Sequence, residues 1–223
     1  MIRFDVITIF PQLIEAFAKE SLLKRAQKKK LLKITAHNLR KWTAGKHKVV
    51  DDKPYGGGLG MVMKVEPIYK AVESLKTKNY KLKTRVILFT PRGKKFTQKI
   101  AYEFSKPNQL IFICGRYEGV DERVAKHIAD EELSMGDYVL MGGESPAMMV
   151  IEAVARLIPG VVGKPTFLKE RNLRGSKGSP RGFLEYPQYT RPEKFLEWKV
   201  PKVLLSGDHK KIKGWKAKHG RVI

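Results

Sequence analysis

The chain has 223 residues, of which 42% are apolar, enough to form a packed core and to exclude wholesale disorder. Its 45 lysines and arginines against 22 acidic residues give a formal net charge of +23, which indicates a polyanionic partner, most often nucleic acid. The alternatives are a solvated basic surface without a partner and, because ribosomal proteins are equally basic, a protein with no catalytic role.

The single cysteine, Cys114, excludes an intrachain disulfide and fits a reducing compartment. The N-terminus lacks the basic start and apolar stretch of a signal peptide. No uncharged apolar run is long enough to span a bilayer. We therefore predict a cytoplasmic protein with no membrane segment.

The first half of the chain alternates predicted strands and helices. Residues 1–10 alternate apolar and polar side chains, which predicts a strand, and Pro11 suits the first turn of a helix. A second strand is predicted at Lys33–Leu39, then a glycine-rich loop at 40–63, a short helix at about 67–77 and a buried strand at Arg85–Phe89.

The pattern continues in the second half. We expect a helix at about 96–105, a buried strand at Gln109–Cys114, a helix through His127, a third short strand at Tyr138–Met141 and an apolar helix from Pro146 through Arg156. Strands that alternate with helices are typical of an α/β fold with a mostly parallel sheet.

The composition changes after Gly163. Residues 164–182 are rich in glycine, proline and charge, which predicts a flexible linker between a domain at 1–163 and an appendage at 183–223. Residues 164–223 hold 16 lysines and arginines against 5 acids, a net charge of +11. We interpret this part as a small, basic, helical domain that helps to bind RNA, with a basic tail for solubility as the alternative.

Three loops with Gly or Pro, at 90–93, 115–119 and 142–143, follow the three predicted buried strands. In open α/β sheets ligands bind at the carboxyl ends of strands, so these loops suggest a nucleoside-sized cofactor, with ordinary turn chemistry as the equal alternative. Dinucleotide and P-loop glycine motifs are absent from the sequence. No metal site is predicted, since the five histidines are scattered; we expect His127 to be structural and Cys114 to be a packed hydrophobe.

Several long motifs resemble one known family. They are Tyr55-Gly-Gly-Gly-Leu-Gly-Met61, Cys114-Gly-Arg-Tyr-Glu-Gly-Val-Asp-Glu-Arg123, Gly136-Asp-Tyr-Val-Leu140 with Gly142-Gly-Glu144, Tyr189-Thr-Arg-Pro-Glu193 and Val203-Leu-Leu-Ser-Gly207. With these motifs in this order, the chain resembles the bacterial tRNA (guanine-N1)-methyltransferases of the knotted SPOUT superfamily. The resemblance extends from residue 2 to about residue 215.

The resemblance implies a trefoil-knotted sheet, S-adenosylmethionine as methyl donor, tRNA as substrate with methylation at guanine 37 beside the anticodon, and a homodimer whose site lies between two subunits. A Mg²⁺ requirement is left open. Carried over by position, the cofactor pocket consists of Pro91, Gly115, Tyr117, Glu118, Gly119, Met135, Gly136, Asp137, Tyr138, Val139, Leu140, Gly142 and Gly143.

The resemblance also implies a catalytic arginine, which falls on Arg156, and an aspartate base in the linker, which this chain lacks. Counting back eight residues from Glu185 reaches Lys177, and counting forward from the glycine pair lands near Glu170. Either Glu170 is the base, which we favour, or Glu185 is, or the enzyme is impaired. Besides the tRNA enzyme, two functions compete: an rRNA methyltransferase of the same superfamily, and an RNA-binding protein that has lost catalysis.

Overall fold

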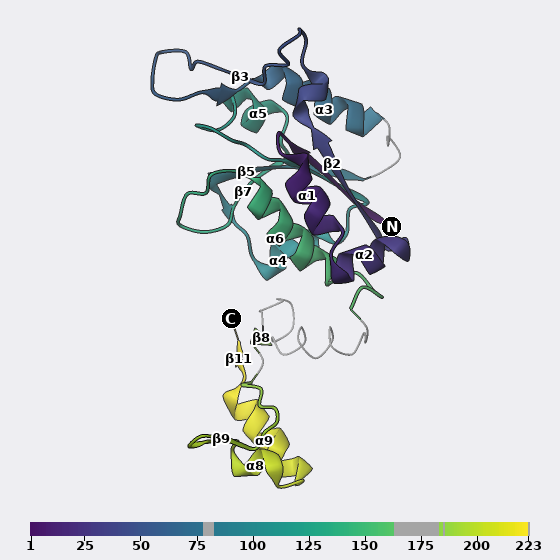
Figure 1. Ribbon diagram of the computed structural model, residues 1–223, viewed down its shortest axis with the longest axis vertical. Coiled ribbons are helices and arrows are strands. Elements are labelled where there is room, and N and C mark those ends of the chain that lie inside the picture. The colour runs from purple at the N-terminus through teal and green to yellow at the C-terminus, as the bar shows by residue number, and fades with distance from the viewer. Residues whose placement is uncertain (78–82, 163–182, 185, 223) are drawn as a thin grey trace. The chain divides into compact units, whose positions relative to one another are not determined.

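The computed structural model describes residues 1–77, 83–162, 183–184 and 186–222 (Figure 1). The chain divides into two compact units, Met1–Gly163 and Lys164–Ile223. The linker predicted at 164–182 lies outside the described residues, so the division into domain, linker and appendage stays a prediction.

The first unit is built on a five-stranded sheet in the order β2-β1-β6-β5-β7. Every neighbouring pair in this sheet is parallel. The strands are β1 (Ile2–Thr8), β2 (Leu32–Asn38), β5 (Thr84–Lys95), β6 (Gln109–Ile113) and β7 (Glu131–Ser134). The α/β class with a mostly parallel sheet is confirmed, whereas the knot that the resemblance implies stays a prediction.

Helices cover both faces of the sheet (Figure 1). One apolar cluster packs the sheet against α1 (Pro11–Ala18), α2 (Ser21–Lys28), α4 (Gln98–Phe104) and α6 (Glu144–Ala155). The other packs it against the 3-10 helix η1 (Leu39–Trp42), α3 (Val65–Thr77) and α5 (Glu122–His127). A two-stranded ladder of β3 (Asp51–Asp52) and β4 (Val62–Met63) lies outside the main sheet.

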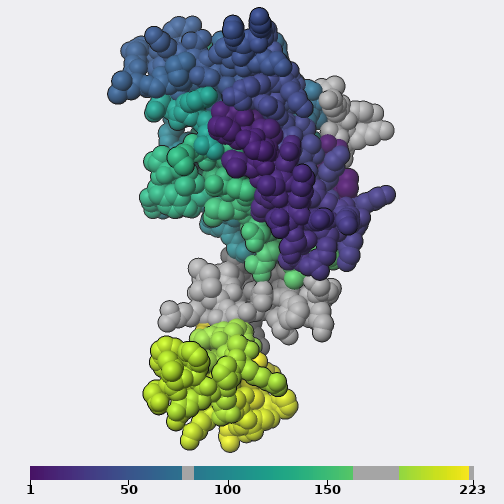
Figure 2. Space-filling model, in the orientation of Figure 1, coloured from purple at the N-terminus to yellow at the C-terminus, as the bar shows by residue number. Residues whose placement is uncertain are grey.

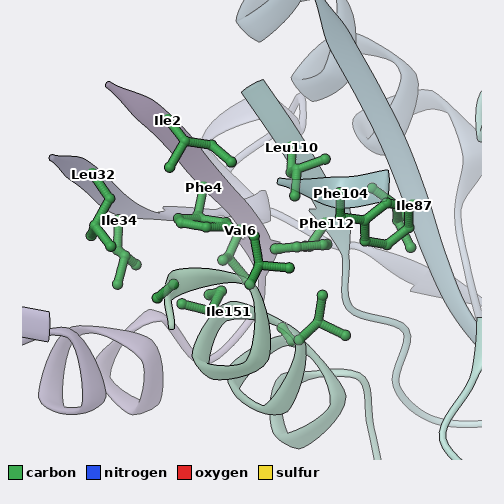
Figure 3. Packing of buried hydrophobic residues seen from close by; sticks show 14 of the residues in the cluster. Ile2, Phe4, Val6, Leu32, Ile34, Ile87, Phe104, Leu110, Phe112 and Ile151 are labelled. Atoms are coloured by element: carbon green, nitrogen blue, oxygen red, sulfur yellow. The ribbon is translucent and has the colours of Figure 1, made fainter. Parts of the chain in front are cut away.

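The alternation in β1 decides which side chains enter which cluster. Phe4 and Val6 enter the cluster under α6, and Ile7 enters the opposite one, because successive strand residues point to opposite faces. The rings of Phe4 and Phe112 stack with centroids 6.3 Å apart, and Phe89 adds a tilted contact to Phe112 (Figure 3). Ile151 of α6 closes this cluster from the helical side.

One predicted strand is wrong. Residues 138–141 form no strand; the fifth strand is β7, seven residues earlier. β7 lies at the edge of the sheet, and its Glu131 forms an ion pair with Arg85. An edge strand tolerates charged side chains such as these glutamates, and their presence hid the strand pattern in the sequence. The apolar run that suggested a strand is exposed instead, with Val139 81% and Met141 88% accessible.

The second unit contains the predicted helices and short antiparallel pairs. Its helices are α8 (Lys202–Leu205) and α9 (His209–His219), and its strands pair as β9 (Lys194–Phe195) with β10 (Trp198–Lys199) and β8 (Phe183–Leu184) with β11 (Arg221–Val222). Trp215 holds the unit together through ring contacts with Tyr186, Tyr189 and His219. Among the described residues, no helix has both the length and the apolar character to cross a membrane.

A buried carboxylate ties three strands together. Asp5 of β1 accepts hydrogen bonds from His37 of β2 and from Gln109 of β6, each at 2.8 Å. Burial by itself raises the pKa of Asp5, but these two bonds and the positive charges of His37 and Arg3 outweigh it, so the pKa lies below its usual value.

We predict that Asp5→Asn destabilises the protein by about 1–3 kcal/mol at neutral pH, because it weakens two buried hydrogen bonds. A carboxylate with a lowered folded pKa contributes stability above its unfolded pKa, near 3.9, and loses it as the pH falls through the folded value. The difference from wild type in urea unfolding should therefore be constant from pH 6 to 8 and shrink below about pH 4. Glu15→Gln, at an exposed position of α1, should show no such loss. A difference that persists unchanged at pH 3 would contradict this role.

Candidate active site

The strands of the parallel sheet end at one edge, and the loops that follow them surround a cavity. Residues 88–92 within β5 and the segments after β6 and β7 line it, with Thr90, Gly115 and Met135 among its walls, and its volume is about 530 Å³. Small-ligand sites typically have volumes of about 300–1,000 Å³ and mix apolar walls with a few polar groups. The cavity therefore fits one nucleoside-sized molecule at the edge where open α/β sheets bind ligands.

The loop after β6 has a tightly fixed backbone. Tyr117 adopts φ +59° and Gly119 φ +112°, and the Gly119 amide donates to the Arg116 carbonyl at 3.1 Å. Two backbone hydrogen bonds join this turn to the 61–63 segment. The Glu118 amide donates to the Met61 carbonyl at 3.0 Å, and the Met63 amide donates to the Gly119 carbonyl at 2.9 Å. This backbone pairing joins the glycine-rich 55–61 motif to the cavity wall.

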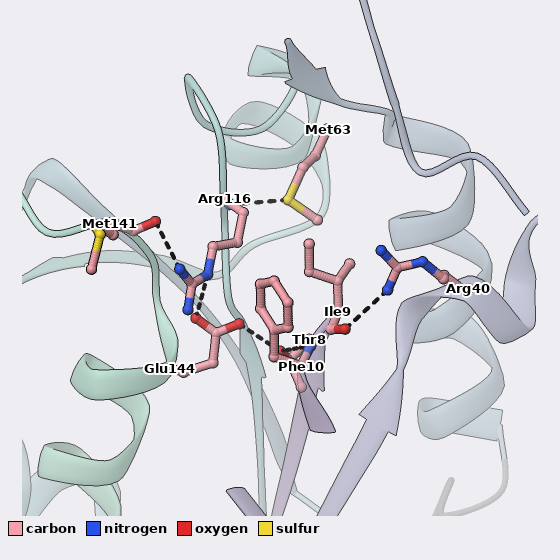
Figure 4. A network of polar contacts seen from close by, with 8 residues as sticks. All are labelled: Thr8, Ile9, Phe10, Arg40, Met63, Arg116, Met141 and Glu144. Carbon is pink, nitrogen blue, oxygen red and sulfur yellow. Dashed lines mark hydrogen bonds and ion pairs between the residues drawn. The ribbon is translucent and has the colours of Figure 1, made fainter. Parts of the chain in front are cut away.

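A buried carboxylate follows Gly143 of the cavity lining and connects three segments of the chain (Figure 4). Glu144, the first residue of α6, is 1% exposed; it accepts a bond from the Thr8 hydroxyl at 2.5 Å and one from Arg116 Nε at 2.9 Å. Arg116 also donates to the Met141 carbonyl at 3.3 Å and lies over the Phe10 ring. The end of β1, the loop after β6 and the start of α6 are thus fixed to one another.

The two glycines before α6 allow close packing against neighbouring residues and do not leave open space for a ligand. A Cβ on Gly142 would lie 2.2 Å from Arg116 Nε, and one on Gly143 would lie 2.6 Å from the Cys114 Cα. The Gly143 amide donates to the Gly115 carbonyl at 3.0 Å. Any side chain at Gly143 would therefore separate α6 from the loop after β6.

The titratable groups near the cavity fall into two kinds. Burial raises the pKa of the Cys114 thiol well above its ordinary value, with the Glu144 carboxylate adding to the effect, so Cys114 is a packed side chain rather than a nucleophile. At the mouth, Arg92 pairs with Glu122 at 2.7 Å, and this contact lowers the pKa of Glu122. His127 is exposed in the last turn of α5.

The cavity contains most of the residues that the resemblance implied. Eleven of the thirteen predicted cofactor residues line it; Gly136 and Asp137 do not. Asp137 points its carboxylate to Lys95 at 2.5 Å, and Gly136, at φ +154°, turns the chain through bonds to the Ser134 hydroxyl.

Of the three predicted catalytic residues the structure describes only Arg156, and it is not among the residues that line the cavity. Arg156 is exposed at the C-terminal cap of α6, whose twelve residues span about 18 Å from the glycine pair. Glu170 and Glu185 lie outside the described residues.

Several lining residues were missed by sequence reasoning, among them Thr90, Arg116, Leu133, Ser134, Met141 and Pro146. Arg116 and Met141 lie within or between motifs that were recognised, so adjacency to those motifs was the available signal. Thr8 and Glu144 lie 136 residues apart, and nothing in the sequence pairs them. In the described part of the chain, no group of three or more His, Cys, Asp or Glu side chains could hold a metal ion.

The fold and the cavity define an α/β protein with a cavity of small-ligand size where its parallel strands end. Comparison with known proteins makes the assignment specific: residues 2–222 match the family described as tRNA (Guanine-1)-methyltransferase TrmD, and the chain belongs to that family.

Relatives named tRNA (guanine-N(1)-)-methyltransferase cover nearly the whole chain. The one from Dictyoglomus turgidum is 54% identical over 218 residues, 98% of this chain and 84% of that protein. Those from Carboxydothermus hydrogenoformans and Staphylococcus epidermidis are 49% identical over 216 residues and 46% identical over 214 residues, covering 97% and 96% of this chain and 81% and 84% of their own lengths.

We predict that Gly143→Ala weakens binding of a small molecule in the cavity at least tenfold, with S-adenosylmethionine as the ligand tested, because the new methyl group would meet backbone at 2.6 Å and push α6 away from the cavity loop. Titration calorimetry measures the change. The control is Gly214→Ala in α9, where a Cβ meets nothing within 4 Å. Unchanged affinity in Gly143→Ala would mean that this close packing does not shape the pocket.

Proposed function

We propose that this protein transfers a methyl group from S-adenosylmethionine to N1 of the guanine at position 37 of tRNA, beside the anticodon, in the cytoplasm. The observation that carries the proposal is the coincidence of a family match over residues 2–222 with a nucleoside-sized cavity lined by the motifs that define the resemblance. The net charge of +23 supports an RNA substrate independently of the match.

The residues of the cavity suit S-adenosylmethionine, which supplies a methyl group on a positively charged sulfur. Leu133, Leu140 and Pro146 offer apolar walls for a base, and the turns at 115–119 and 135–143 offer peptide groups for polar contacts. The pocket loops also carry Glu118 and Glu122 at the rim, and acidic groups favour a cationic ligand.

The remaining task of the protein is to align guanine and to move its N1 proton. N1 of guanine is protonated and a poor nucleophile at neutral pH, so a carboxylate base and a cation near O6 would both lower the barrier. We assign the cation to Arg156 and the base to Glu170. Because α6 separates Arg156 from its own chain's cavity by about 18 Å, we propose a homodimer in which Arg156 of a second copy completes each site.

The rim of the cavity supports a dimer. Tyr138, Val139, Leu140 and Met141 form a contiguous exposed apolar loop that lines one side of the pocket, with Val139 and Met141 more than 80% accessible. Exposed apolar patches are typical of surfaces that bind another protein, a membrane or a ligand, and we assign this one to a second copy of the chain. A second copy on this loop would bury it and exclude water from the reacting atoms.

Transfer of a labelled methyl group to an unmodified tRNA transcript tests the function. Nucleoside mass spectrometry should find 1-methylguanosine in a transcript with guanine at position 37 and none when that guanine is replaced by adenine. Transfer to rRNA fragments but not to tRNA would favour the rRNA enzyme. Tight tRNA binding without any transfer would favour the binding protein that has lost catalysis.

We predict that Glu170→Gln lowers the single-turnover rate about 10²-fold or more, the usual effect of losing a general base, while affinity for both substrates stays within a few-fold. Glu185→Gln is the matched control, since it neutralises the other candidate carboxylate. Lys177, at the position that the family's aspartate would occupy, is cationic at neutral pH and is a poor proton acceptor. A normal rate in Glu170→Gln together with a slow Glu185→Gln would transfer the role to Glu185.

A further inference from the structure

The positive charge of this chain does not lie at the cavity. The three segments that form its walls and rim, residues 90–95, 115–123 and 131–144, hold five lysines and arginines against seven acids. Four of these cations are paired with acids: Arg92 with Glu122, Lys95 with Asp137, Arg116 with Glu144 and Arg123 with Asp121. A polyanion gains little attraction here, so its phosphates need another surface.

A strongly basic surface lies at α2 instead. Between residues 19 and 33 the chain carries seven cations and one acid. We call these cations the α2 face: Lys19, Lys24, Arg25, Lys28, Lys29, Lys30 and Lys33. All seven are exposed, and no residue in the described part of the chain forms an ion pair with any of them.

The helix that carries several cations of the α2 face is packed firmly against the rest of the first unit. Leu23 and Ala26 are buried in the cluster that also holds α6, and Gln27 bonds to the Ala18 carbonyl at 2.7 Å and to the Ile34 amide at 3.1 Å. Lys24, Arg25 and Lys28 lie on the opposite side of the helix and are exposed. The N-terminal residues, in purple, form a broad part of the surface of the first unit (Figure 2). The charges are therefore held in a fixed array rather than on a loose tail.

Lys30 occupies a position that normally favours glycine. α2 ends with bonds from the Lys30 amide to the Gln27 carbonyl and from the Leu31 amide to the Ala26 carbonyl, and Lys30 adopts φ +55°. This is the Schellman geometry, in which glycine avoids the steric cost of the left-handed conformation. The chain keeps a cation here against a conformational preference.

Ordinary explanations cover only part of the array. Arg25 and Lys28 lie in the last turn, where cations complement the helix dipole, and Lys33 lies on the edge strand β2, where lysine discourages strand pairing. Neither reason applies to Lys30 or to Lys24, which repels Lys28 one turn away. A polyanion bound across the face would relieve this repulsion and release its counterions.

We propose that the α2 face binds the sugar–phosphate backbone of the tRNA substrate, holding it at a surface separate from the cavity. The identity of the RNA rests on the proposed function. The face adjoins the segment after α6, since a Cβ on Gly160 would lie 3.3 Å from Leu31 Cδ1. Arg156, four residues before Gly160, is also exposed, so the end of α6 extends the basic surface.

The first test removes charge from the face and follows tRNA binding against salt. The triple variant Lys24→Gln, Arg25→Gln, Lys28→Gln keeps residues of similar helix propensity, so α2 should remain folded. Fluorescence anisotropy with an unmodified tRNA transcript should show about tenfold or more weaker binding. The log–log salt slope should fall by about 2, because each phosphate that the protein no longer neutralises removes about 0.7–0.9 from it.

A matched control removes the same charge elsewhere. Lys70→Gln, Lys76→Gln, Lys99→Gln changes surface lysines on α3 and α4, two of which are already paired with acids. It should reduce the slope much less. Equal effects of the two triple variants would overturn the proposal, because they would show that total charge, not this face, attracts the RNA.

Lys30→Gly separates RNA binding from structural support. Glycine suits φ +55°, so the midpoint of thermal unfolding should stay the same or rise, while tRNA affinity should fall. Calorimetry with S-adenosylhomocysteine should show unchanged binding in both the triple variant and Lys30→Gly. If Lys30→Gly binds tRNA as wild type does while the triple variant also keeps its salt slope, the face has no role in RNA binding.

These experiments can refute RNA binding by the α2 face and the proposed methyltransferase function separately. Methyl transfer by the triple variant should keep its rate at saturating tRNA but need more tRNA to reach it. If wild type binds tRNA through the α2 face but transfers no methyl group, the proposed function is refuted and the proposal that the α2 face binds RNA is retained. Transfer with an unaltered tRNA requirement in the triple variant would refute the α2 face alone. The RNA-binding proposal would also be overturned if the triple variant lost binding to anionic lipid vesicles but bound tRNA as wild type does.

Discussion

The site depends on one buried carboxylate. Glu144 opens α6 and joins the Thr8 hydroxyl at the end of β1 to Arg116 in the loop after β6. An unpaired charge at 1% exposure would be strongly unfavourable, so both partners must be in place for α6 to begin where it does. Through Arg116, which also holds the Met141 carbonyl, the same interaction fixes the loop that forms the far wall of the cavity.

The parallel sheet makes that interaction possible. Because all neighbouring strands run in one direction, the carboxyl ends of β1, β5, β6 and β7 meet at a single edge. Loops separated by tens of residues in the sequence become the walls of one cavity. α6 then leads away from this edge and carries Arg156, the proposed catalytic cation, to its other end, away from the cavity of its own chain.

Charge follows the same separation. The loops around the cavity hold more acids than bases, in a chain whose net charge is +23, and most of their cations are neutralised by neighbours. This arrangement suits a cationic small ligand and gives phosphates little reason to approach. Cations that form no ion pair with any described residue gather on the α2 face, and further positive charge lies in the basic C-terminal residues, which leaves recognition of RNA to surfaces outside the pocket.

The sequence by itself determined the fold class, the order of most elements and the cavity loops, because local periodicity and recognisable motifs carry that information. It placed the strand at 138–141 instead of 131–134, since an edge strand tolerates glutamates and an exposed loop can be apolar. It indicated that Gly142 and Gly143 matter, but not that Arg116 and Cys114 press against them. The pairing of Thr8 with Glu144, the pairing of rim cations with acids and the isolation of the α2 charges were decided only by the tertiary structure. Each depends on distances between residues far apart in the chain, and a one-dimensional pattern contains no such distances.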